Sequence, residues 1–340
     1  MQGPWTLQEG TFGVSRDDYP ICTVAVDTTT YDREPTETTM ASAQTPSSVV
    51  VGTDGSTAAL DAVRWAVREA SARRVPLRIV HVAPRHDPDP VFGSPDVDRD
   101  YGDAALLAAA AAAAEEPNSP VVEPVYRQGT PESVLRHEAV SASLLVVGSV
   151  GIGMLGSLVL GSTAAELAAT APCPVAIIKS YRTAVSTDEH NALPVVAVLA
   201  GTDDVWEEWD SIVAAATAEA RIRRTSMIIA SSDEAGDTDG GLERRITRWQ
   251  AQTPDVRIDS ISQDGALATL AVSLSKAAQL TVVGPPEHDR LPLLGITGRT
   301  VHQLLFHSDS PLMICRSHPV GPGPAASTAR STAGVTTAHR

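Results

Sequence analysis

The chain has 340 residues, a length that predicts two domains. Acidic residues outnumber basic residues by 41 to 26, and the net charge of −15 argues against nucleic acid or an anionic membrane surface as the main partner. Aromatic residues make up only 4% of the chain and cysteines number three, which argues against base-stacking platforms and a disulfide scaffold and favours a reducing, cytoplasmic compartment.

Residues 1–46 differ from the rest of the chain because they show no regular alternation of strands and helices. Only the run from Ile21 to Val26 has the composition of a strand. We expect this segment to be disordered, or to be a wrongly assigned extension whose true start is Met40. It contains no apolar run like that of a signal peptide. The longest apolar run in the chain, from Ala104 to Ala114, is too short to span a bilayer.

Apolar strands and amphipathic helices alternate between residues 47 and 180. The expected strands are Val49–Gly52, Leu77–Val82, Val121–Arg127, Leu144–Gly148 and Val175–Lys179. The expected helices are one that Ser56 caps, Asp103–Glu116, Pro131–Val140 and Gly161–Thr170, with a loop over Pro84–Gly102. Continuous apolar strands that alternate with helices predict a parallel sheet covered on both faces.

The same pattern recurs between residues 194 and 317. Its expected strands are Val195–Gly201, Ser226–Ser231, Val256–Ile261, Leu280–Gly284 and Leu312–Cys315, with a helix over Trp206–Ala220. Gly52-Thr53-Asp54 is echoed by Gly201-Thr202-Asp203, and a proline precedes the final strand in both copies. We therefore predict an α/β protein of two tandem open-sheet, Rossmann-like domains, each with five mostly parallel strands. The predicted domains are 47–180 and 194–317, with a linker over 181–193 and a disordered tail over 318–340.

A glycine-rich stretch between Gly148 and Thr163 is the main candidate for chemistry. A strand is expected to end at Gly148, and a helix is expected to begin near Ser162. Glycines let the backbone approach a polyphosphate closely, and the N-terminus of a helix offers free N–H groups to anions. The stretch therefore predicts a mononucleotide site across the carboxyl edge of the sheet, with the phosphates on this loop.

Two common phosphate motifs compete for the same residues. The pattern G-x-G-x-x-G runs from Gly151 to Gly156, but a dinucleotide site needs an acidic residue at the end of the next strand, where Lys179 stands. The spacing of a P-loop runs from Gly156 to Thr163, but Ser162 occupies the place of the phosphate-binding lysine. Both motifs are therefore disfavoured.

A third spacing, G-x2-G-x9-G-[ST], is satisfied by Gly148, Gly151, Gly161 and Ser162. Placed after the fourth strand, this arrangement resembles the universal stress protein family. The resemblance also rests on the segments Val49–Ser56, His81-Val82, Gly129-Thr130-Pro131 and Pro172–Val175. It is strong over the first copy and weaker over the second, so that the whole chain looks like the tandem two-domain type of that family.

The resemblance implies a site for ATP with Mg²⁺ in the first domain. It places Thr53 and Asp54 by the adenosine, Leu77 at the adenine through its backbone, and Gly148 near the ribose. The implied phosphate contacts are Gly151, Gly161, Ser162 and Thr163. Val150 departs from the family pattern, which often has Arg or His at that place, and this removes one charged contact to phosphate.

Several of these residues also have a purely structural explanation. A lone glycine is most often a turn residue. Asp54 could brace a turn or cap a helix. His81 is more often a hydrogen-bonded residue at a strand end than a catalytic base. The four residues of the glycine motif taken together favour nucleotide binding.

The second copy departs from the glycine pattern. Glu287 stands where the second glycine belongs, and Arg299 replaces the serine. A carboxylate repels phosphate, and an arginine can fill the phosphate position itself. We predict that this half binds ATP weakly or not at all.

The sequence shows no nucleophile paired with a general base and no His/Glu cluster with metal-ligand spacing. The resemblance therefore implies an ATP-binding regulatory protein of the stress response with an unknown protein partner, and not an enzyme, although weak ATP hydrolysis stays open. The alternatives are a nucleotide-free protein-interaction module of the same fold and an enzyme that acts on an adenylated substrate. Fifth strands commonly pair two domains in this family. We thus expect Val175–Lys179 and Leu312–Arg316 to pair within one chain as a pseudo-dimer, and a homodimer of chains stays open.

Overall fold

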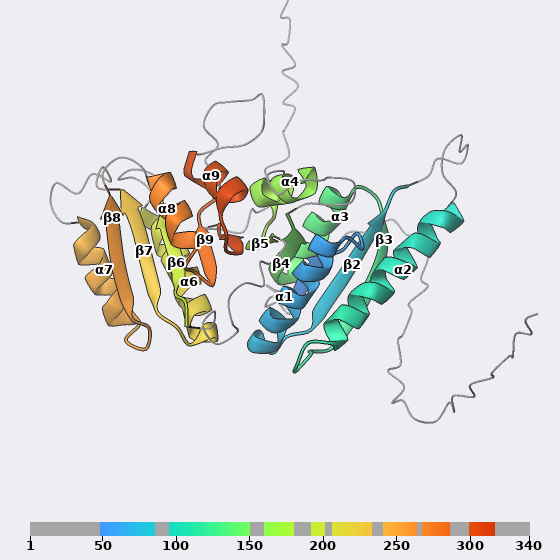
Figure 1. Ribbon diagram of the computed structural model, residues 1–340, viewed down its shortest axis with the longest axis horizontal. Helices are drawn as coiled ribbons and strands as arrows, with labels where there is room; N and C mark the ends of the chain where they lie inside the picture. The colour runs from blue at the N-terminus through green and yellow to red at the C-terminus, as the bar shows by residue number, and fades with distance from the viewer. Residues whose placement is uncertain are drawn as a thin grey trace, which may run out of the picture. The chain divides into compact units, whose positions relative to one another are not determined.

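The structure, a computed structural model, describes residues 48–85, 95–149, 160–179, 192–200, 206–232, 241–263, 267–285 and 299–316 (Figure 1). Residues 44–340 form one compact unit, separate from residues 1–43. Our predictions for the segment 1–46, with Met40 as its start, and for the tail 318–340 lie outside the described residues, as does nearly all of the predicted linker. The domain bounds therefore stay predictions.

The first half of the compact unit is an alternation of strands and helices. Its elements are β1 (Ser48–Gly52), α1 (Thr57–Arg73), β2 (Leu77–Ala83), α2 (Pro95–Ala114), β3 (Val122–Gln128), α3 (Pro131–Glu138), the 3-10 turn η1 (Ala139–Ser141), β4 (Ala142–Gly148), α4 (Ser162–Thr170) and β5 (Val175–Ile178). The strands lie in the order β3-β2-β1-β4-β5, and all neighbours in this series are parallel. The prediction of an open parallel α/β sheet is confirmed.

The second half repeats this arrangement. Its elements are β6 (Val195–Leu199), α6 (Trp206–Arg223), β7 (Met227–Ser232), α7 (Gly241–Gln252), β8 (Ile258–Gln263), α8 (Leu267–Ser275), β9 (Leu280–Val283), α9 (Arg299–His307) and β10 (Leu312–Ile314). The order β8-β7-β6-β9-β10 matches the order of the first half strand for strand. Parallel pairing joins these five strands as well.

The start of α2 differs from our expectation. The loop that we expected up to Gly102 is wrong over residues 95–102, which are helical. Proline is favourable at the first position of a helix, and two aspartates in the first turn suit the positive end of the helix dipole. Gly102 lies inside this helix, and the position requires glycine because a Cβ there would come within 2.5 Å of the Tyr126 ring and 2.8 Å of the His81 ring.

Helices cover both faces of the sheet (Figure 1). On one face, side chains of α1, α2, α6 and α7 join one apolar cluster, which includes Ala66, Leu106, Trp209 and Trp249. On the other face, side chains of α3, α4, α8 and α9 join a second cluster, which includes Leu135, Leu167, Ala271 and Leu304. Burial on both faces explains why the central strands are almost wholly apolar.

The two halves are joined through their last strands. β5 and β10 pair antiparallel, with Ala176 opposite Met313 at the centre of the register. All ten strands therefore form one sheet, with β3 and β8 at its outer edges. The expected pairing of the fifth strands within one chain is confirmed.

A ring of four charged side chains crosses the junction between α1 and α6. Arg73 contacts both Glu69 of its own helix and Glu219 of the other, and Arg223 contacts the same two carboxylates. Both glutamates are buried. Burial raises the pKa of Glu219, and the neighbouring Glu69 carboxylate adds to this rise, while the two arginines act in the opposite direction. Two negative and two positive groups thus balance one another in a place that excludes water.

We predict that Arg73→Met strongly destabilises the protein. The change leaves two buried carboxylates with a single arginine, and the loss of one partner from a buried ion pair costs about 3–5 kcal/mol. Urea unfolding followed by circular dichroism measures this loss. Arg221→Met is the matched control, because the Arg221–Asp255 pair is exposed and its removal should change the midpoint little. Equal shifts of the urea midpoint in the two variants would show that the buried ring contributes no more to stability than an exposed ion pair.

A second prediction concerns Lys179, which follows β5. Burial lowers the pKa of Lys179 to about 8, although Asp309 acts in the opposite direction. In the unfolded chain the pKa returns to about 10.4, so between these two values the unfolded chain binds more protons. The contribution of this side chain to the free energy of unfolding therefore rises with pH across this window. We therefore expect the free energy of unfolding of wild type, measured by urea unfolding, to increase relative to that of Lys179→Met as the pH rises from 7.5 to 10. A difference between the two proteins that stays constant with pH would contradict this prediction.

Candidate functional site

The turn after β1 is held by its own polar groups. The backbone N–H of Thr53 donates to the carbonyl of Val80 (2.9 Å), and its hydroxyl accepts from the N–H of Gly55 (3.2 Å). The Asp54 carboxylate accepts from the N–H of Ser56 (3.0 Å), and Ser56 in turn caps α1. Gly55 has φ +78, the left-handed region that favours glycine. One carboxylate oxygen of Asp54 therefore braces this turn, as the structural explanation of the residue predicts.

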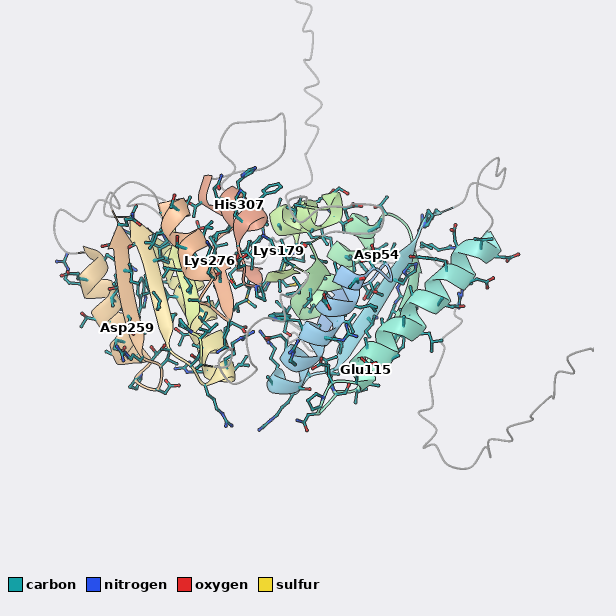
Figure 2. The ribbon with its side chains drawn as sticks, viewed as in Figure 1. Asp54, Glu115, Lys179, Asp259, Lys276 and His307 are labelled. Atoms are coloured by element: carbon teal, nitrogen blue, oxygen red, sulfur yellow. The ribbon has the colours of Figure 1, made fainter. Side chains whose placement is uncertain are left out.

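Aromatic side chains surround this turn. The Nδ1 atom of His81 lies 2.9 Å from the carbonyl oxygen of Thr53. His81 is therefore a hydrogen-bonded strand residue, as the sequence led us to expect. Tyr101, on α2, donates its hydroxyl proton to the carbonyl of Asp54 (2.6 Å) and packs beside the His81 ring. Burial and the Asp54 charge both raise the pKa of Tyr101. Figure 2 labels Asp54 at this end of the sheet.

Gly148 ends β4 directly beneath the start of α1. A Cβ at this glycine would lie 3.1 Å from the carbonyl oxygen of Ala58 and 3.2 Å from the backbone nitrogen of Ala59. These backbone atoms belong to the first turn of α1 and cannot swing aside as the end of a long side chain can. Glycine at this position is therefore what allows α1 to approach the central strand.

The chain returns to the end of β4 after the glycine-rich stretch. The N–H of Ser149 donates to the carbonyl of Ile178 (2.8 Å), and the N–H of Gly161 donates to the carbonyl of Ser149 (2.8 Å). The start of α4 is thereby fixed beside the end of β4. Gly151 and Val150, which lie between these two points, are outside the described residues.

The N-terminus of α4 combines the amide groups of its first turn, which have no side-chain cap from the N-cap residue, with two hydroxyls. Gly161, which precedes the helix, has no side chain that could accept a hydrogen bond from the first turn. Ser162 is exposed, and the Thr163 hydroxyl donates to the carboxylate of Glu132 (2.8 Å), a residue in the first turn of α3. Our sequence reasoning missed Glu132, because its proximity to Thr163 follows from the packing of α3 beside α4.

Of the residues predicted from the sequence, the structure brings Thr53, Asp54, Gly148 and the Gly161-Ser162-Thr163 start of α4 to the carboxyl edge of the sheet. Leu77 does not join them. It is the first residue of β2 and pairs with Val49 at the other edge, so about 20 Å of strand separates it from the carboxyl end. The residues of β2 that reach the carboxyl edge are Val82 and Ala83.

The matching place in the second half is built differently. Gly284 follows β9 as the counterpart of Gly148, but a Cβ there would lie against the carboxylate of Glu208, 3.1 Å from its Cδ atom. A negative side chain thus occupies the position that backbone atoms of α1 occupy in the first half. Glu287 lies outside the described residues, and Arg299 begins α9.

The described residues contain neither a cluster of metal ligands nor a membrane-spanning helix. No group of three or more His, Cys, Asp or Glu side chains in this part of the chain could hold a metal ion. Among the same residues, no helix is both long enough and apolar enough to cross a membrane.

Comparison with known proteins gives a consistent picture. The sequence model of the universal stress protein family matches residues 47–179. Universal stress protein Rv2028c of Mycobacterium tuberculosis is 32% identical over 266 residues, which cover 76% of this chain and 93% of that protein. The crystal structure of a universal stress protein from Archaeoglobus fulgidus is similar with a TM-score of 0.59 and 15% identity, over 79% of this chain and 98% of its own. A universal stress protein solved in complex with cAMP is 30% identical, covers 40% of this chain and 98% of its own, and has a TM-score of 0.30.

We predict that Gly148→Ala destabilises the protein by about 1–3 kcal/mol, the usual cost of overpacking. The added methyl group would press on the backbone of α1, which must shift to admit it. Gly52→Ala is the matched control, since its methyl group would meet the flexible end of the Leu135 side chain, which can move. Urea unfolding of both variants should show the larger loss for Gly148→Ala, and the reverse order would contradict our account of this glycine.

Proposed function

Because the chain belongs to the universal stress protein family, we propose that it is a regulatory protein of the stress response whose first half binds ATP with Mg²⁺. The proposed site lies at the carboxyl edge of the first half of the sheet. The second half has no nucleotide in this proposal. Binding, rather than turnover, is the proposed activity.

One observation carries the proposal: the hydrogen bond from Gly161 to Ser149 sets the N-terminus of α4 against the end of β4. The first N–H groups of a helix have no partner within the helix, and the helix dipole favours negative charge there. Phosphate groups bind readily at such a terminus. In open α/β sheets, ligands bind just outside the carboxyl ends of the strands, which is where this terminus lies.

The remaining parts of the nucleotide follow from the same geometry. The phosphates would meet Gly161, Ser162 and Thr163, together with Gly151 from the stretch outside the described residues. The ribose would lie near Gly148, and the adenosine near Thr53 and Asp54. Our expected adenine contact at Leu77 is not carried into this proposal, because that residue lies at the opposite edge of the sheet. The backbone near Val82 takes its place in the proposal.

Glu132 supports the presence of a metal ion with the nucleotide. A carboxylate beside the N-terminus of α4 repels free phosphate, but Mg²⁺ is commonly bound by one or two carboxylates together with phosphate oxygens. Glu132 and the Thr163 hydroxyl, which lie 2.8 Å apart, offer oxygen atoms of this kind. When bound, Mg²⁺ would neutralise phosphate charge there, and these two side chains would hold it.

Binding without rapid hydrolysis is favoured by the composition of the phosphate loop. The stretch from Gly148 to Thr163 contains no lysine or arginine. Enzymes that transfer phosphoryl groups use such cations to stabilise the charge of the transition state. We therefore propose that ATP acts through occupancy, by shifting the population of conformations that a protein partner recognises.

The alternative is a protein-interaction module that binds no nucleotide. The observation that favours it is the same Glu132–Thr163 hydrogen bond, because the carboxylate already supplies a negative group at the start of α4. Glu132→Gln separates the two readings. The change weakens binding of Mg-ATP if Glu132 holds the metal. In the alternative, wild type binds no Mg-ATP, and the variant either stays without binding or gains it once the carboxylate is gone.

We predict that calorimetric titration of the full chain with Mg-ATP finds one site per chain. Gly161→Asp should abolish binding, because a carboxylate at the N-cap of α4 occupies the place of the phosphates. Gly298→Asp, at the counterpart position of the second half, is the matched control and should leave binding unchanged. Two sites per chain would contradict a silent second half, and the absence of binding would favour the interaction module.

A further inference from the structure

Each half of the sheet places a basic residue just after its last strand, and that residue reaches a helix of the other half. Lys179 follows β5 and donates to the carbonyls of Leu304 (3.4 Å) and Ser308 (3.0 Å), at the end of α9 (Figure 2). Arg316 follows β10 and donates to the carbonyl of Ala168 (3.0 Å) and to that of the next residue, at the end of α4. The two contacts are reciprocal.

The reciprocity follows from the strand pairing. Lys179 and Arg316 each lie five residues after the proline that precedes the final strand of their half. β5 and β10 run antiparallel about the Ala176–Met313 pair, so the end of each strand projects toward the helices of the other half. The same local sequence position therefore produces the same contact twice.

The carbonyls at the end of a helix are the groups that most need a donor. The last four carbonyls of a helix have no partner within it, and a positive charge at this end is favourable for the helix dipole. Arg316 satisfies two such carbonyls of α4 at once. Arg316 is partly buried, and this burial lowers its pKa from a value so high that the side chain stays charged.

We propose that Arg316 is a positioning residue for the nucleotide site of the first half, because it holds, from the second half, the helix whose opposite end faces the phosphates. This inference rests on the function proposed above. α4 has nine residues and is about 14 Å long, so a displacement at its carboxyl end moves its N-terminus as well. Only three residues of α4 are buried, and two of them are alanines: Ala164, Leu167 and Ala168. Apolar packing therefore holds this helix weakly, and the contacts at its ends contribute much of what keeps it in position.

A consequence is that nucleotide binding and the docking of the second half against α4 stabilise each other. If docking of the second half sets α4 for phosphate, then phosphate on α4 stabilises the docking by the same free energy. The second half, which lacks the glycine motif, thus contributes to a site that it does not itself form. Its role in this proposal is to hold the carboxyl end of α4 in position.

The test compares Arg316→Met with Lys179→Met in the full chain. Both changes remove one contact between a side chain and the end of a helix in the other half, but only Arg316 touches α4. In calorimetric titration with Mg-ATP, Arg316→Met should raise the Kd by roughly fivefold or more. Lys179→Met should leave the Kd within about twofold of wild type, and Arg316→Lys should recover part of the loss, because it keeps the positive charge. Equal effects of the two methionine variants would overturn the proposal.

Hydrogen exchange in the absence of nucleotide gives an independent measurement. Arg316→Met should speed exchange of the amides in α4 but not in α9, and Lys179→Met should do the reverse. Unchanged exchange in α4 would overturn the proposed hold on this helix, and faster exchange without a change in Kd would reduce Arg316 to a structural role. If wild type binds no nucleotide, the proposed function fails by itself, and the positioning role falls with it even where exchange shows that Arg316 holds α4.

Discussion

The antiparallel pairing of β5 with β10 is the constraint on which the arrangement of the two halves depends. Three residue pairs join these strands, and the pairing brings α1 beside α6 on one face of the sheet and the last strand of each half beside a helix of the other half on the second face. On the first face this alignment produces a closed ring of two glutamates and two arginines. Such a ring is stable in a buried place only because every charge meets two of opposite sign, and the loss of any member leaves the others uncompensated.

The two halves share one architecture but differ at the carboxyl edge of the sheet. Each brings the start of a helix against a glycine at the end of a central strand, but the atoms above that glycine differ. Backbone atoms of α1 lie over Gly148, whereas the Glu208 carboxylate lies over Gly284. In the first half, the positive N-terminus of α4 lies at this edge together with the carboxylates of Asp54 and Glu132. In the second half, the Glu208 carboxylate fills the space directly over the glycine, and this obstruction favours our proposal of one nucleotide site per chain.

Much of the fold was predictable, because buried parallel strands are continuous apolar runs and their helices repeat at a regular spacing. The pairing of the last strands was predictable from the family resemblance. The start of α2 was not, since Gly102 was read as a loop residue when it is a contact point for Tyr126 and His81. Tyr101, Glu132 and Arg316 were missed for a related reason. Tyr101 and Glu132 reach the site, and Arg316 reaches the far end of α4, from segments distant in sequence. No local pattern records which segments will pack together.

The presence of both halves on one chain changes how their association depends on the protein concentration. Two separate copies of such a half would meet only as often as their concentration allows. A covalent connection holds the partner at an effective concentration in the millimolar range when the tether is short and flexible. Whether the ring of charges between α1 and α6 is closed therefore does not depend on dilution. Such a connection also pairs two unlike halves in every molecule, so that a change at the site of one half does not cost that half its partner.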